Sequence, residues 1–122
     1  MTVREAIDKA DLLYPNVFSF SEKADWLKEL DMKVSAELFS RFSDSQDISD
    51  CKQERYAPDT RLLIEGPYEN LYILFIVMKT DIVNSDTVRY GNSSALFNNE
   101  YLAFSNHYIR THRMKSAEIT LK

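Results

Sequence analysis

The stretch YENLYILFIVMKTDIVNSD (residues 68–86) decides between a helical and a β-containing fold. Residues 71–78 are apolar at every position, so the pattern alone fits either a buried strand or a helix covered on several sides. The length of the stretch and its helix-forming neighbours favour a helix. Pro67 also suits a first helical position, where its missing N–H costs nothing. We therefore expect a central helix from about Pro67, with a kink or a short turn at residues 84–87.

A short amphipathic helix is predicted at residues 3–13, near the start of the chain. Thr2 and Glu5 have the Thr-x-x-Glu spacing of a capping box, in which each side chain accepts from the other residue's backbone N–H. Pro15 disfavours helical geometry at Tyr14 and ends the element.

A longer amphipathic helix is predicted at residues 20–42. Ser19 and Glu22 repeat the capping-box spacing at its start. Charged residues occupy the side opposite its apolar stripe, as expected for a surface helix. The stripe consists of Leu27, Leu30, Val34 and Leu38, widened by Trp26, Phe39 and Phe42.

A fourth helix is predicted at residues 93–112. Phe97, Tyr101, Phe104 and Tyr108 are spaced four, three and four apart, which places them in one stripe on a helix. We expect Phe97 and Phe104 to belong to the core. The two tyrosine hydroxyls require partners when buried, so Tyr101 and Tyr108 fit either the edge of the core or an interface.

Residues 43–66 lack clear helical periodicity and contain a proline and a glycine. The run RLLI within them fits a short strand, paired with residues 54–57 in a small hairpin. With only 2 glycines and 3 prolines the chain has few turn residues for a β-sandwich or barrel. The expected fold is mainly α: a single domain of residues 1–122, with a four-helix body and a projecting loop or β-hairpin arm at 43–66.

The net charge of −4 is unevenly distributed. Residues 109–122 contain four basic residues and one acidic residue, a net charge of +3, so residues 1–108 carry −7. An acidic body does not suit a protein that coats DNA, which needs a broad positive surface. It suits a protein that DNA passes without sequence-specific binding.

Nothing in the sequence indicates a membrane protein or an exported one. The apolar run 71–78 is too short to span a bilayer, and the first residues lack the basic region and apolar core of a signal peptide. Cys51 is the only cysteine, which excludes an internal disulfide and fits a reducing compartment.

The residues that usually carry catalysis do not form a recognisable set. His107 and His112 are five residues apart and point in different directions on a helix, without a metal-binding motif around them. Asp81 and Asp86 lie at a helix end, where we expect them to be exposed to solvent. We therefore expect no enzymatic activity, no cofactor and no metal.

Three stretches together resemble a known family: YPNVFSFSEKADWLKELD (14–31), RLLIEGPYENLY (61–72) and RYGNSSALFNNEYLAFSNHYIRTHR (89–113). The family comprises small head–tail connector (adaptor) proteins from tailed phages and prophages of Gram-positive bacteria. The residues that carry the resemblance are Trp26, Leu27, Leu30, Pro67, Tyr68, Leu71, Tyr72, Tyr90, Asn92, Ser93, Ala95, Leu96, Phe97, Tyr101, Arg110, Thr111 and His112.

The resemblance implies a structural subunit of a homo-oligomeric ring that joins the portal to neck or tail proteins and lets DNA pass. It implies the host cytoplasm before assembly and the virion neck afterwards. The alternative is a small intracellular interaction or regulatory module of a mobile element. Candidate interface residues are the tyrosines and the basic end of the last predicted helix: Tyr68, Tyr72, Tyr101, Tyr108, Arg110, His112 and Arg113.

Overall fold

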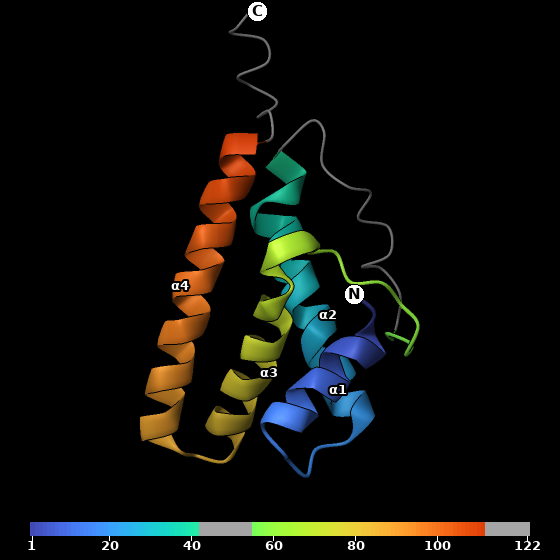
Figure 1. The fold of residues 1–122 in the computed structure, drawn as a ribbon, viewed down its shortest axis with the longest axis vertical. Helices are drawn as coiled ribbons and strands as arrows, with labels where there is room; N and C mark the ends of the chain where they lie inside the picture. The colour runs from blue at the N-terminus through green and yellow to red at the C-terminus, as the bar shows by residue number, and fades with distance from the viewer. Residues whose placement is uncertain (42–54, 112–122) are drawn as a thin grey trace, which may run out of the picture.

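The computed structural model describes residues 1–41 and 55–111. Within these ranges the chain is mainly helical, which confirms the predicted fold class. Figure 1 shows α3 in the middle of the molecule, with α4 along one side and α1 and α2 on the other. The helices are α1 (Val3–Leu13), α2 (Phe20–Glu37), α3 (Asn70–Val83) and α4 (Thr87–Thr111), with short 3₁₀ helices η1 (Phe39–Arg41) and η3 (Gly66–Tyr68).

Helix α1 has the predicted bounds and the predicted cap. The Thr2 backbone N–H donates to the Glu5 carboxylate (2.8 Å), and the Glu5 N–H donates to the Thr2 hydroxyl (3.3 Å). These bonds satisfy two backbone donors that have no partner inside the helix. Val3, Ala6, Ile7 and Ala10 are buried on one side of the helix, whereas Leu13 at its end is exposed.

Helix α2 begins at the predicted cap but ends earlier than residue 42. The Ser19 hydroxyl accepts from the Glu22 backbone N–H (3.2 Å). Leu38 leaves α-helical geometry, with φ −122° and ψ −63°, and the chain continues as η1. The tighter turn keeps Phe39 buried, so the predicted apolar stripe continues past Glu37, where the observed α-helix ends.

Helix α3 is buried on all its sides along its first half. Residues 71–73 and 75–77 are buried, and consecutive helical residues point in directions about 100° apart. The strand interpretation of this run is thereby excluded. Pro67 lies in η3, so the α-helix itself begins three residues later than predicted.

A tight turn separates α3 from α4, and α4 begins at Thr87 rather than at residue 93. Ser85 takes a left-handed φ of 58° in this turn. The Asp86 side chain then accepts from the Arg89 backbone N–H (3.1 Å), which supports an early helix start. Gly91 lies inside this helix.

Residues 55–64 run along the helical body as a strap, which we define by these residues. The Val3 N–H donates to the Thr60 carbonyl (2.9 Å), and the Leu62 N–H donates to the Met1 carbonyl (3.0 Å). Leu63 and Ile64 are buried in the core. The strap therefore pairs with the chain's first residues.

The hairpin within residues 43–66 is not supported, because the described residues contain only an isolated bridge between Thr2 and Arg61. The expected pairing of RLLI with residues 54–57 is wrong for residues 55–57, since RLLI contacts the N-terminus instead. The rest of the predicted arm, residues 42–54, lies outside the described residues.

The aromatic stripe of α4 faces the core, as predicted for Phe97 and Phe104. Phe97 packs against Phe75 on α3, with ring centroids 5.3 Å apart. Tyr108 is also buried, with 6 % of its surface exposed, and it stacks on Phe39 at 4.9 Å. Tyr101 alone is partly exposed, so the edge of the core passes through that residue.

We expect Phe104→Ala and Tyr108→Ala each to lower the free energy of unfolding by about 3–5 kcal/mol, because each removes a buried ring. Urea denaturation followed by circular dichroism measures both losses. Asn98→Ala is the control, since it changes an exposed residue of the same helix and is expected to alter stability by less than about 0.5 kcal/mol. A small loss at Tyr108 would contradict its place in the core.

Candidate interaction surfaces

Two of the candidate interface residues lie inside the molecule. Tyr72 is fully buried, and Tyr108 is nearly so. The Tyr72 ring belongs to the all-round apolar surface of α3, and its hydroxyl finds partners within the core. These two residues are therefore part of the core and not of an exposed surface.

The other described candidates are accessible but belong to different environments. The Tyr68 ring lies 5.3 Å from the His107 ring, at the end of the molecule where α4 finishes. The Tyr101 hydroxyl contacts a carboxylate oxygen of Glu37 at 3.5 Å. Burial, together with the nearby Glu37 charge, raises the pKa of Tyr101 to about 12.

The basic end of α4 is only partly within the described residues. Arg110 is exposed. His112 and Arg113, the remaining candidates, lie outside the described residues.

A buried carboxylate, Asp31, joins three segments of the core. The Tyr56 hydroxyl of the strap donates to Oδ2 (2.7 Å), and the Tyr72 hydroxyl of α3 donates to Oδ1 (2.5 Å). The Leu63 backbone N–H also approaches Oδ2, at 3.4 Å. The Tyr72 hydroxyl in turn accepts from the Ile64 N–H (2.7 Å). This network fixes the strap across α2 and α3.

Burial raises the pKa of the Asp31 carboxyl to about 6, because the charged form loses its hydration. The hydrogen bonds from Tyr56, Tyr72 and Leu63 oppose this rise by stabilising the charge. The folded protein therefore binds this proton more tightly than the unfolded chain does.

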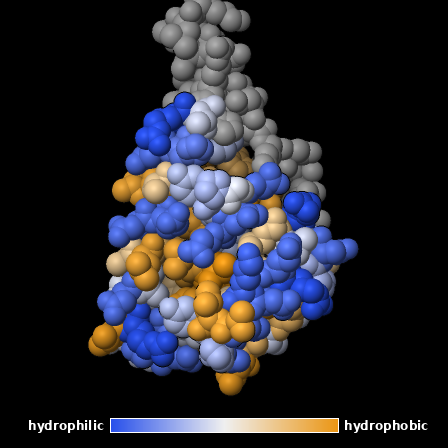
Figure 2. Space-filling model, in the orientation of Figure 1, coloured by the Kyte–Doolittle hydropathy of each residue, from blue (hydrophilic) through white to orange (hydrophobic). Residues whose placement is uncertain are grey.

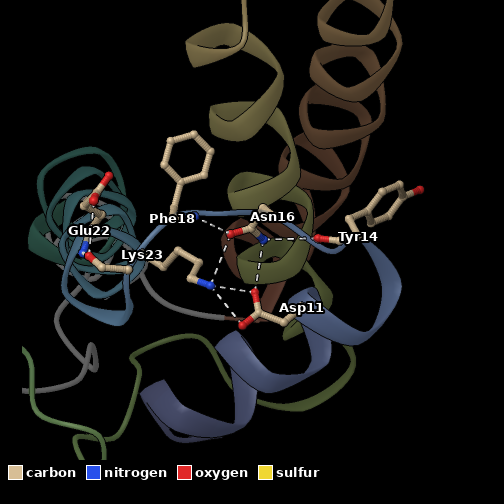
Figure 3. A network of polar contacts seen from close by, with 7 residues as sticks. Asp11, Tyr14, Asn16, Phe18, Glu22 and Lys23 are labelled. Atoms are coloured by element: carbon tan, nitrogen blue, oxygen red, sulfur yellow. Dashed lines mark hydrogen bonds and ion pairs between the residues drawn. The ribbon is translucent and has the colours of Figure 1, made fainter.

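A second polar network shapes the connection between α1 and α2 (Figure 3). The buried Lys23 ammonium lies 2.7 Å and 2.9 Å from the two carboxylate oxygens of Asp11. The Asn16 amide accepts from the Lys23 ammonium and donates to the Asp11 carboxylate. It also donates to the Tyr14 carbonyl (3.1 Å). In Figure 3 the Tyr14 ring points away from this network. The network therefore fixes the Tyr14 backbone through its carbonyl and makes no contact with the ring.

An apolar groove lies between the end of α1, α3 and the first half of α4. Its volume is about 420 Å³. Figure 2 shows apolar side chains gathered on this face, in the region between α4 and α1. Exposed apolar side chains line it: Leu13, Tyr14 and Leu96. Apolar surface of this kind is typical of protein–protein contacts.

Polar groups lie at one side of the same groove. The Ser93 hydroxyl donates to Oδ2 of Asp81 (2.8 Å), and Arg89 Nε lies 3.9 Å from Oδ1. Asp81 is buried, so the prediction that it is exposed at a helix end is wrong. The reason is the tight α3–α4 turn, which returns α4 and its Ser93 against the carboxylate.

In residues 1–41 and 55–111 no three His, Cys, Asp or Glu side chains are grouped so that they could hold a metal ion. Over the same ranges no helix combines the length and the apolar character needed to cross a membrane. Comparison with protein-family models, curated proteins and solved structures finds no match to this chain.

We expect the stability of the protein, relative to Asp31→Asn, to fall as the pH rises from about 4 to 7. The pKa of Asp31 is about 6 in the folded protein, against an ordinary 3.8. The protonated carboxyl therefore stabilises the fold fully below about pH 4, and this stabilisation is lost as the carboxyl ionises while the pH rises through 6. The shift corresponds to about 3 kcal/mol.

Denaturant unfolding of both proteins across this pH range measures the difference. The asparagine keeps the shape of the side chain and does not titrate, so changes at other carboxylates cancel. Parallel stability curves for the two proteins would contradict the buried, raised-pKa carboxyl.

Proposed function

We propose that this protein is a structural subunit of a phage or prophage head–tail connector ring, which joins the portal to the tail and lets DNA pass. The observation that carries the proposal is the composition of the groove. Residues 14–31 and 89–113, which carry the resemblance to connector proteins, meet there although they are far apart in the sequence. The first contributes Tyr14, and the second contributes Asn92, Ser93 and Leu96.

The groove is suited to accept an apolar side chain from a neighbouring neck protein. Leu13 is 61 % exposed beside it, and such surface is stabilised when a partner removes it from water. Arg89 adds an exposed basic group next to the apolar surface, which can orient an incoming acidic or carbonyl group. A ring subunit needs such contacts with the subunits beside it and with the proteins above and below.

The charge distribution supports passage of DNA rather than binding. Residues 1–108 carry a net charge of −7, which repels the phosphate backbone over most of the body. In this proposal the protein is in the host cytoplasm before assembly and in the virion neck afterwards.

A regulatory or interaction module of a mobile element would use the same groove for a different protein. The two functions differ in the partner and not in the surface. The test therefore has to identify the partner.

We expect the wild-type protein to co-sediment with particles that contain the cognate portal, and Leu13→Asp to reduce this binding at least tenfold, because a buried carboxylate is costly in an apolar contact. Met32→Asp is the matched control. It places the same charge on a 53 % exposed apolar residue of α2, away from the groove, and should bind as the wild type does.

The connector proposal fails if the wild-type protein never joins portal-containing particles and deletion of its gene leaves DNA-filled heads able to accept tails. Capture of a single non-structural protein that Leu13→Asp abolishes would instead assign the regulatory function.

A further inference from the structure

Helix α4 has two opposite faces, and only one of them is used by the fold. The inner face contributes Phe97, Phe104 and Tyr108 to the core. The outer face carries a stripe of seven residues spaced alternately four and three apart, all of them exposed. The outer stripe consists of Val88, Asn92, Ala95, Asn99, Leu102, Asn106 and Ile109.

The outer stripe contains two interleaved seven-residue repeats. Apolar residues recur at positions 88, 95, 102 and 109, and asparagines recur at positions 92, 99 and 106. Alternating spacings of three and four are those of the seam of a coiled coil, whose two core positions are called a and d. The asparagines occupy the a positions and the apolar residues occupy the d positions. This register extends over three heptads.

The outer stripe is also unusually free of charge for an exposed helix face. Between residues 90 and 109 the only formally charged side chain is Glu100, which is not part of the stripe. A surface helix normally places charged residues opposite its buried face. Helix α2 of this protein does so, with exposed charges at Asp25, Glu29 and Lys33. The outer face of α4 therefore resembles a contact surface more than a solvated one.

We propose that the outer stripe of α4 is a self-association surface, which pairs with the α4 helix of a second copy of this chain in parallel, in-register alignment. The repeat of asparagines in the outer stripe favours a second copy of this chain as the partner. In a parallel pair each a position faces the same a position of the partner, so each asparagine meets an asparagine. Amide side chains both donate and accept, which makes an Asn–Asn layer self-complementary.

An antiparallel pair would place asparagines opposite apolar residues. In antiparallel pairs a positions face d positions, so Asn99 would face Leu102 of the second copy and Asn92 would face Ile109. An amide buried against an aliphatic side chain loses its hydrogen bonds to water without replacement. The parallel arrangement keeps the amides together and packs Val88, Leu102 and Ile109 each against its own copy.

The fold makes such pairing geometrically accessible. Figure 1 shows α4 at one edge of the molecule, running along most of its length. The helix has 25 residues, or about 37 Å, and is already formed in the single chain. Pairing therefore does not bear the cost of forming the helix, which makes isolated short coiled coils weak. Three asparagine layers fix the register of the pair but lower its affinity. We therefore expect a dimer with a dissociation constant in the micromolar range.

Sedimentation velocity of the purified chain alone tests this inference, over concentrations from low micromolar to near-millimolar. We expect a concentration-dependent dimer. Leu102→Glu should raise its dissociation constant at least tenfold. Asn99→Val should lower the dissociation constant, because it replaces one amide layer with apolar contact. Leu102 is 60 % exposed, so the variant keeps its fold, as circular dichroism will verify. Leu12→Glu, at an 83 % exposed position of α1, is the control and should dimerise normally.

Cysteine cross-linking in a Cys51→Ser background tests the orientation. In a parallel pair Asn92→Cys and Ile109→Cys each form a disulfide with their own copy. In an antiparallel pair only a mixture of the two variants does, and that result overturns the parallel register.

A monomer at every concentration, or an oligomer that Leu102→Glu leaves intact, overturns the self-association surface itself. These measurements involve no phage protein, so their outcome is independent of the connector proposal.

Discussion

Residues 71–78 of helix α3 are apolar on all sides of the helix, and the burial of this stretch is the constraint on which the rest of the structure depends. A helix with this surface is stable in water only when other elements cover it in every direction. Helix α4 covers one side, α1 and α2 cover the other, and Leu62, Leu63 and Ile64 of the strap are buried with it. Each covering helix needs only one apolar stripe for this purpose, and α2 accordingly carries charged residues on its opposite face.

The buried polar groups of the core connect α3 to the elements that cover it. Asp31 on α2 is buried because it accepts hydrogen bonds from the strap and from Tyr72 of α3. Asp81 at the end of α3 is buried because Ser93 of α4 reaches it. In both places a carboxylate connects α3 to a covering element, and so determines how that element lies on an otherwise non-directional apolar surface.

The sequence was informative wherever the deciding interaction is local. The Thr2–Glu5 box, Pro15 and the amphipathic spacing of α2 act within a few residues, and the helices they predict are present. The strap was not predictable, because its path depends on backbone hydrogen bonds between Leu62 and Met1 and between Thr60 and Val3, which are far apart in the chain. Helix α4 starts six residues earlier than predicted, because the Asp86 cap and packing along α3 keep residues 87–92 helical.

The candidate surface was predicted less well than the fold, for the same reason. Tyr72 and Tyr108 were predicted to be interface residues, yet both are buried, and Tyr72 finds its partner in Asp31, which is distant in sequence. The groove combines Leu13 with Leu96, two residues that no local pattern relates. The seven-residue repeats on α4 are a local pattern, but they indicate a surface only because the structure places the aromatic stripe on the opposite face of the helix.

Residue-resolved amide hydrogen exchange of the isolated chain tests most directly whether the strap and the helices enclose α3 as one core. The Leu63 and Ile64 amides donate to Asp31 and to the Tyr72 hydroxyl, so they become free only when the core opens. Both amides are expected to exchange as slowly as those of α3. Rapid exchange at Leu63 and Ile64, with α3 still protected, would show that the strap is not part of the core and would contradict the account.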